Sequence, residues 1–163
     1  MRDHTMPNEK TPADVAVTRT VPGGLVVPGA AVRIGPSEMM PRDRLLGFVG
    51  GADIVVTMFS DRVDEEFLDA AGSQLRGVCN LAVGYNNIDT DACAQRGVVV
   101  TNTPDAVTEG TANIAWALLL AVARRLVEGD RFARSGEWER GGLLSMADFL
   151  GVDLTGRTLL IVG

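Results

Sequence analysis

The fold of this chain is decided by residues 54–101, which read IVVTMFSDRVDEEFLDAAGSQLRGVCNLAVGYNNIDTDACAQRGVVVT. Three apolar, β-prone runs alternate here with two helical segments, in the order strand Ile54–Met58, helix Val63–Ala71, strand Gly77–Asn80, helix Asp89–Gln95 and strand Val98–Thr101. Strands that alternate with helices predict an α/β fold with a parallel sheet covered by helices on both faces.

Two shorter β-prone runs precede this stretch. The first, Val15–Thr18, is closed by the turn Pro22-Gly23-Gly24, and the second, Ala31–Ile34, ends at Gly35-Pro36. Pro41 then suits the first position of a helix that reaches about Phe48. We therefore expect residues 1–12 to form a flexible tail and residues 13–107 to form one α/β domain.

The remaining residues, 108–163, are expected to leave that domain. From Thr108 the apolar residues recur at helical spacing, which predicts one long helix to about Gly136 that bridges two domains. A linker then leads to Thr158–Gly163, an apolar run that predicts a buried strand ending on glycine. In a dinucleotide-binding unit such a strand opens a glycine-rich turn and a helix that hold the pyrophosphate, but one glycine is a weak signal.

Composition and charge narrow the class of protein. With 46% apolar and 22% charged residues, the chain of 163 residues is typical of a globular protein. The net charge of −6, from 15 basic and 21 acidic residues, argues against nucleic acid or an anionic membrane as the main partner.

The sequence shows neither a membrane-spanning run nor a secretory signal, and it contains two cysteines. The longest apolar run, Ile114–Ala123, is far shorter than the ~20 residues of a membrane-spanning helix. The N-terminal residues have no apolar core, so a cytoplasmic location is expected. Cys79 and Cys93 match no metal or redox spacing and are expected to be reduced, buried thiols.

Four further segments carry a more specific pattern. They are Val15–Arg19; Ser60–Asp64; Asn80–Asp89 with Arg96-Gly97-Val98 and Thr101–Pro104; and Thr108–Ala112 through Ala123-Arg124-Arg125, with Phe149-Leu150-Gly151. In order and spacing they resemble the D-isomer-specific 2-hydroxyacid dehydrogenases, most closely the glyoxylate and hydroxypyruvate reductase branch. The resemblance covers nearly the whole chain, and one departure is Asn86, where relatives often carry aspartate.

The resemblance implies a two-domain NAD(P)-dependent oxidoreductase. Residues 13–107 would be its flavodoxin-like substrate-binding domain, and residues 108–163 would hold the inter-domain helix, a linker and the first strand of an incomplete Rossmann domain. Such enzymes, expected as homodimers at full length, transfer a hydride from NADH or NADPH to the carbonyl carbon of a 2-keto acid. The catalytic arginine, glutamate and histidine would lie beyond this chain, whose only histidine is His4, so the chain alone is expected to be inactive.

Three residues of the first domain are implied in substrate binding. Backbone N–H groups of the Val83-Gly84 step, at the carboxyl edge of the sheet, would meet the substrate carboxylate, since glycine lets an anion approach the main chain. The alternative is that this step is merely a turn. Met58 resembles the apolar residue that lines the same pocket, although a methionine suits a core equally well.

Two residues are implied in cofactor binding. Thr111 resembles the threonine near the nicotinamide cofactor in related enzymes, or it faces solvent in the first turn of its helix. Gly163 would be the first glycine of the cofactor turn. No metal site is expected, because the acidic residues Asp61, Asp64, Glu65 and Glu66 suit a helix start without any metal.

A second class of function stays open, namely a non-catalytic binding or regulatory module on the same fold, such as a corepressor-like relative or a degenerate remnant. A phospho-receiver would need a pair of acids before the first strand, where only Asp14 stands. A flavin carrier would need a hydroxyl-rich loop after that strand, which Thr18–Pro22 does not supply.

Overall fold

The computed structural model describes residues 12–141 and 149–162. The chain divides into two compact units, Met1–Ala106 and Val107–Gly163, each of which is described by itself. The first unit carries the sheet and the helices that pack on it, and the described part of the second carries three further helices and the segment 149–162.

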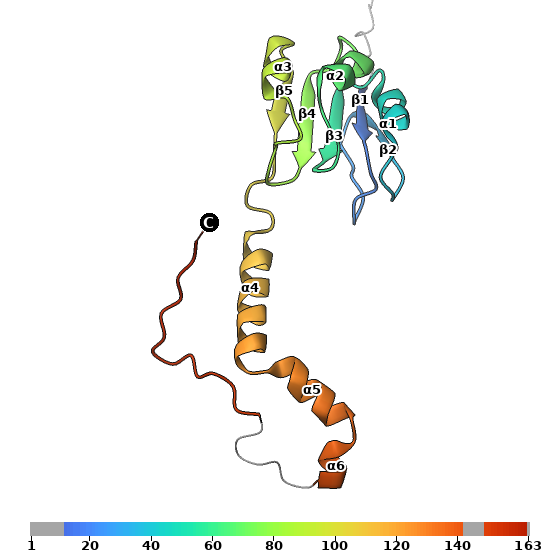
Figure 1. Ribbon diagram of the computed structural model, residues 1–163. Coiled ribbons are helices and arrows are strands. Elements are labelled where there is room, and N and C mark those ends of the chain that lie inside the picture. Colours follow the sequence, from blue (N-terminus) through green and yellow to red (C-terminus); the bar gives the residue numbers. More distant parts are fainter. Residues whose placement is uncertain (1–11, 142–148, 163) are drawn as a thin grey trace, which may run out of the picture. The chain divides into compact units, whose positions relative to one another are not determined.

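The first unit is built on a five-stranded parallel sheet (Figure 1). Its strands are β1 (Ala13–Val17), β2 (Ala30–Ile34), β3 (Ile54–Met58), β4 (Gly77–Leu81) and β5 (Val99–Thr101), in the spatial order β2-β1-β3-β4-β5. The predicted α/β class is confirmed, and the order is that of flavodoxin-like sheets. Because all strands run in parallel, their carboxyl ends lie at one edge of the sheet.

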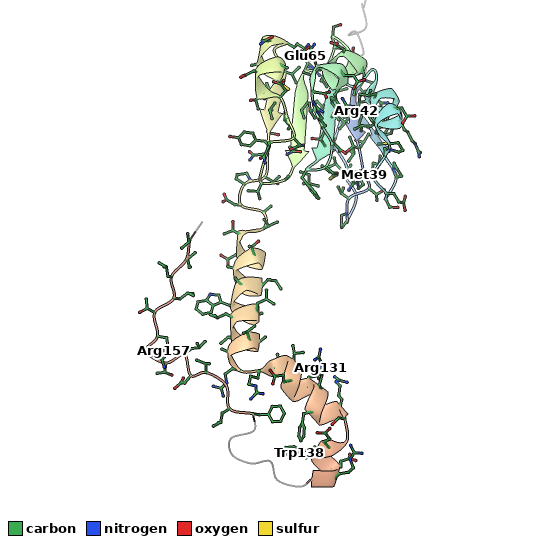
Figure 2. The ribbon with its side chains drawn as sticks, in the orientation of Figure 1. Met39, Arg42, Glu65, Arg131, Trp138 and Arg157 are labelled. Carbon is green, nitrogen blue, oxygen red and sulfur yellow. The ribbon has the colours of Figure 1, made fainter. Side chains whose placement is uncertain are left out.

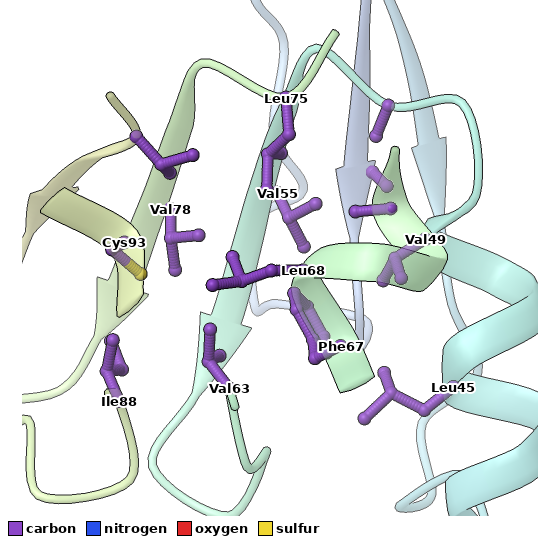
Figure 3. Close-up of a cluster of buried hydrophobic side chains, with 14 of the residues drawn as sticks. Leu45, Val49, Val55, Val63, Phe67, Leu68, Leu75, Val78, Ile88 and Cys93 are labelled. Carbon is purple, nitrogen blue, oxygen red and sulfur yellow. The ribbon is translucent and has the colours of Figure 1, made fainter. Parts of the chain in front are cut away.

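One face of the sheet carries the main hydrophobic core. Helices α1 (Arg42–Val49), α2 (Glu65–Ala71) and α3 (Thr90–Gln95) all contribute to it. Figure 3 shows Phe67 and Leu68 of α2 in the middle, between Val49 of α1 and Cys93 of α3. Phe67 and Val49 are fully buried, so this face is tightly closed.

The other face carries a smaller cluster. Val15, Val17 and Met58 are buried in it, and Val21 and Leu25 of the segment between β1 and β2 pack against them. All three helices of this unit belong to the first cluster, so the predicted helix layer is present on only one face among the described residues. The strand alternation predicts a buried sheet but not which segment covers each face.

Acidic residues cap the starts of α2 and α3. The predicted helix at Val63 begins instead at Glu65, because the Asp64 side chain accepts a hydrogen bond from the Phe67 N–H at 3.1 Å and so forms the N-cap. The Arg42 guanidinium, labelled at the start of α1 in Figure 2, pairs with Asp64 and with Glu66, and the Glu66 contact is 3.0 Å. Partial burial raises the pKa of Asp64, but the Phe67 hydrogen bond and the arginine charges outweigh it and hold this pKa below its ordinary value.

The second unit corrects one prediction. In place of one helix to about Gly136 there are α4 (Thr108–Ala123) and α5 (Leu126–Arg134), bent by 64°, followed by α6 (Glu137–Gly141). Arg125 lies between α4 and α5 in the left-handed region, at φ 52°.

The cause of this break is a segment far along the chain. Val152 donates its N–H to the Ala123 carbonyl at 2.7 Å, which caps the last turn of α4. The backbone at Gly151 comes so close that a Cβ atom there would lie 2.2 Å from the same oxygen. The returning chain therefore ends α4 by occupying its last carbonyl, a contact that helical periodicity cannot reveal.

The predicted strand at Thr158–Gly163 is also wrong for the residues that the structure describes. Residues 158–162 have no strand partner, and Ile161 and Val162 are 81% and 87% exposed. A strand needs a neighbour for its backbone groups, and none lies beside this segment within the described ranges. Gly163 lies outside the described residues.

Helix α4 is apolar but buries none of its side chains in the part of the chain that is described. Trp116 is 54% exposed and lines a hollow with residues 159–162. No single helix among the described residues is long and apolar enough to cross a membrane; the bent pair α4 and α5 meets that test only when both helices are counted together.

Candidate functional site

The carboxyl edge of the sheet gathers polar groups from several strands. Thr18 and Arg19 follow β1, Ser60 and Asp61 follow β3, and the loop 82–89 follows β4. Ligands of open parallel sheets bind at this edge, because strand ends and helix starts leave backbone groups available there. The groups at this edge that are not already bonded within the protein are those that a ligand can meet.

Asp61 joins the ends of β1 and β3. The residue is 4% exposed, and its Oδ2 atom accepts the Thr18 hydroxyl at 2.5 Å and the Met58 N–H at 2.8 Å. A buried carboxylate that accepts two hydrogen bonds holds its two donors firmly, because a buried charge or a buried donor without a partner is costly in free energy. Asp61 therefore fixes the position where β3 ends.

Two asparagines extend this polar network to β4. The Asn87 Nδ2 donates to the carbonyls of Asp61 at 2.8 Å and of Met58 at 3.2 Å. Asn80, only 1% exposed, accepts the Thr57 hydroxyl at 3.1 Å through Oδ1. The network thus ties the end of β3 to the loop that follows β4.

That loop is held by its carbonyl groups. The carbonyls of Val83 and Gly84 accept hydrogen bonds from the side-chain amides of Asn102 and Asn80, both at 2.8 Å. The neighbouring carbonyls of Ala82 and Tyr85 accept backbone N–H groups, each at 2.9 Å. Four consecutive carbonyls are therefore engaged.

The N–H groups of the same peptide units are not engaged. No acceptor for the N–H of Val83, Gly84 or Tyr85 is found among residues 12–141 and 149–162. Val83 and Tyr85 are 42% and 56% exposed, so solvent or a ligand can reach this loop. Backbone N–H groups that lack a protein acceptor are the donors from which anion sites are built.

Gly84 does not need glycine for its backbone angles, because it is absent from the glycines with positive φ. A Cβ atom there would instead meet the Asn86 Oδ1 at 3.3 Å. A side chain at Gly84 would therefore press against Asn86, whereas the backbone conformation there does not itself require glycine. The predicted role of Val83 and Gly84 in substrate binding stays a prediction.

Met58 is only 8% exposed and packs with Val15 and Val17 in the second cluster. Met58 therefore lies in a core, which is the alternative to the pocket-lining position given in the sequence analysis. Its backbone is part of the site's scaffold, since its N–H and carbonyl bond to Asp61 and Asn87. Its predicted pocket-lining role stays a prediction.

The two residues implied in cofactor binding lie in the second unit or beyond the description. Thr111 is exposed in α4, and its N–H donates to the Val107 carbonyl at 2.9 Å, so that N–H is not available to a ligand. Gly163 and His4 both lie outside the described residues.

Several residues of the site are missed by reading the sequence. Asn80 and Asn102 look like an ordinary strand residue and a turn residue, and only their hydrogen bonds reveal their place. Arg19 is also missed: it donates from Nη2 to the Ser60 hydroxyl at 2.9 Å, while its buried Nε has no hydrogen-bond partner among the described groups. An arginine directly after a strand that ends at the site edge is the signal that could have identified it.

Within the described residues, acidic side chains and thiols form no further candidate site. No group of three or more metal-ligating side chains is found in the described part of the chain. Cys79 and Cys93 are both free, and burial, followed by the nearby Asp89 carboxylate, raises the pKa of the Cys93 thiol. A buried, protonated thiol is a poor nucleophile.

Known proteins with a similar sequence belong to one family of dehydrogenases. Residues 30–149 match the family model described as D-isomer specific 2-hydroxyacid dehydrogenase, catalytic domain. A glyoxylate reductase of Thermococcus kodakarensis is 48% identical over 154 residues, which are 91% of this chain and 46% of that enzyme.

Solved structures agree. A protein from Thermus thermophilus has a TM-score of 0.75 at 38% identity, covering 86% of this chain and 45% of its own. An NADPH-dependent glyoxylate/hydroxypyruvate reductase from Sinorhizobium meliloti, in complex with NADP and malonate, has a TM-score of 0.57 at 26% identity, covering 90% and 44%.

The chain spans less than half the length of these relatives. The family model nevertheless matches most of the present sequence, and the structural match covers 86% of it. The predicted resemblance is confirmed, and the chain belongs to the D-isomer specific 2-hydroxyacid dehydrogenase family.

Proposed function

We propose that this chain supplies the substrate-binding part of an NAD(P)-dependent 2-hydroxyacid dehydrogenase that reduces a small 2-keto acid of the glyoxylate or hydroxypyruvate type. The observation that carries the proposal is the loop after β4. Its carbonyls are bonded to the protein, while the N–H groups of Val83, Gly84 and Tyr85 have no acceptor among the described residues. Such a loop offers neutral donors to a carboxylate, the group that all 2-keto acids share.

The relatives support the substrate class. The family is NAD(P)-dependent and acts on 2-keto acids. The Thermococcus kodakarensis relative is a glyoxylate reductase, and the Sinorhizobium meliloti structure holds malonate, a carboxylate. The proposed substrate is of the same chemical class.

The described residues of the second unit bear on whether this chain can bind NAD(P) by itself. Among residues 12–141 and 149–162, the second unit contains no strand that leads through a glycine-rich turn into a helix. Thr111, the described residue that the resemblance implies in cofactor binding, is exposed on α4. These residues do not fit a dinucleotide site. We therefore assign to this chain only substrate positioning, and we propose that hydride transfer, proton donation and the expected homodimer depend on residues outside it.

Carboxylate binding can be tested by amide NMR on the whole 163-residue chain. Glycolate, the hydroxy acid that corresponds to glyoxylate, is the probe, and glycolamide is the matched control without charge. We expect saturable shifts of the Val83, Gly84 and Tyr85 amide signals with glycolate alone. Equal shifts with both compounds, or none at these positions, would overturn the proposal.

The division of labour has its own test. We expect no glyoxylate- or hydroxypyruvate-dependent oxidation of NADH or NADPH by the purified chain. Measurable turnover would show that the missing chemistry is present in these residues after all, and would overturn the assignment of substrate positioning alone.

A further inference from the structure

The loop after β4 gains its donors from the way its carbonyls are held. A trans peptide unit is planar, so its C=O and N–H point in opposite directions. The carbonyl of Val83 shares a peptide unit with the N–H of Gly84, and the carbonyl of Gly84 shares one with the N–H of Tyr85. A group that fixes either carbonyl therefore fixes the direction of the following N–H.

Two side-chain amides do this in the structure. Asn102 Nδ2 donates to the Val83 carbonyl and Asn80 Nδ2 to the Gly84 carbonyl, both at 2.8 Å. Each N–H in the same unit is turned away from its asparagine and has no acceptor among the described residues. The two asparagines come from different strands, since Asn80 lies in β4 and Asn102 directly follows β5.

The orientation of the Asn80 amide is itself fixed. Its Oδ1 accepts the Thr57 hydroxyl at 3.1 Å, and at 1% exposure no solvent competes for the amide. If the amide were reversed, its oxygen would face the Gly84 carbonyl oxygen, and two acceptors would oppose each other. Its nitrogen is therefore held toward the loop.

We propose that Asn80 and Asn102 are positioning residues for the carboxylate of the substrate: Asn102 sets the Gly84 N–H and Asn80 sets the Tyr85 N–H. This inference rests on the proposed function, because it names the side chains that prepare the same site. Neither asparagine touches the substrate in this scheme. Their effect is to hold two donors in place before binding, so that no ordering of the loop is needed when the ligand arrives.

The experiment compares variants of the whole chain. Asn102→Ala removes the donor to Val83 at a half-buried position, so the fold is expected to survive. Asn80→Ser is the second variant. The matched control is Asn86→Ala, which changes an exposed asparagine of the same loop that has no hydrogen bond among the described groups. Glycolate affinity is measured by amide NMR, and residual dipolar couplings report the direction of each N–H.

We expect each positioning variant to lose about tenfold in glycolate affinity, as for a hydrogen bond to a charged group, while Asn86→Ala stays within about twofold. In Asn102→Ala the coupling of the Gly84 N–H changes, and in Asn80→Ser that of the Tyr85 N–H changes, while the amide signals of the β-strands stay in place. A merely structural role would move the strand signals or the unfolding midpoint instead.

The outcomes separate the two proposals. Wild-type chain that fails to bind glycolate refutes the proposed function and this inference with it. The inference alone is refuted if the wild-type chain binds glycolate and the Asn102→Ala variant binds it equally well. It is also refuted if the Gly84 N–H keeps its direction in Asn102→Ala. Should Asn80→Ser fail to fold, the Asn102→Ala result decides.

Discussion

Replacing Asp61 by alanine is the sharpest test of the scaffold beneath the site. The change removes the one acceptor oxygen shared by the Thr18 hydroxyl and the Met58 N–H. Thr18 and Met58 are 3% and 8% exposed, so water does not readily replace that oxygen. A buried donor left without a partner costs about 1–3 kcal/mol, so the two donors together predict a loss of about 2–6 kcal/mol in the free energy of unfolding.

This loss is large beside the total stability of a domain, about 5–15 kcal/mol. Urea unfolding, followed through the amide NMR signals of the first unit, measures it without interference from the second unit. The control is Asp69→Ala, because Asp69 is 72% exposed in its ion pair with Arg96, and such surface pairs contribute about 0–1 kcal/mol. A loss for Asp61→Ala no greater than that for Asp69→Ala would refute the assignment of Asp61 as the fastening between β1 and β3.

Three further predictions concern the core, the thiols and the α2 cap. Phe67→Ala, at a fully buried position, should cost about 3–5 kcal/mol of unfolding free energy, whereas Phe59→Ala, at 72% exposure, should cost less than about 0.5 kcal/mol; similar losses in urea unfolding would contradict the core assignment. A thiol-reactive dye should label half-buried Cys79 in the folded protein and Cys93, whose pKa is raised by burial, only after unfolding; equal labelling rates would contradict this. The pKa of Asp64 is lowered in the folded state, so the ionised carboxylate stabilises the fold above the unfolded carboxyl pKa of about 3.9, and this stabilisation is lost as the pH falls through the lowered pKa. Asp64→Asn should therefore make the unfolding midpoint depend less on pH in the acid range. An unchanged pH dependence would contradict the role of the Asp64 carboxylate as a cap.

The parallel sheet could be predicted from the sequence because its strands are short apolar runs separated by helices. Ile54–Met58 is found as predicted, and the other strands differ from their predicted bounds only at the ends. The starts of α2 and α3 shift for a local reason: Asp64, predicted to lie inside a helix that begins at Val63, and Asp89, predicted as a first helical residue, both act as caps. These are contacts between near neighbours, to which sequence patterns are sensitive.

The two wrong elements depend on distant contacts. The break after α4 follows from the approach of Gly151 and Val152 to the carbonyl of Ala123. The run 158–162 has the composition of a strand but no neighbour to pair with in the described chain. Apolar pattern alone specifies neither a partner strand nor a returning segment.

The sequence predicts where a site would lie on this sheet, but not the hydrogen bonds that hold the loop there. The Val83-Gly84 step is predicted from its place after a strand of a parallel sheet together with the family resemblance, and its role in substrate binding stays a prediction. The hydrogen bonds from Asn80 and Asn102 join it to two strands, and nothing in the local sequence distinguishes these asparagines from others in strands and turns. Their hydrogen bonds to the loop form only when the strands are assembled.

A site formed from main-chain groups also affects how such a protein can diverge. The side chains of Val83 and Tyr85 are exposed and are not needed to hold the loop, since the carbonyls are what the protein grips. Mutations can therefore accumulate at these two positions without dismantling the donors beneath them. If this loop binds a substrate carboxylate as proposed, one inherited loop can serve descendants whose substrates differ beyond that carboxylate.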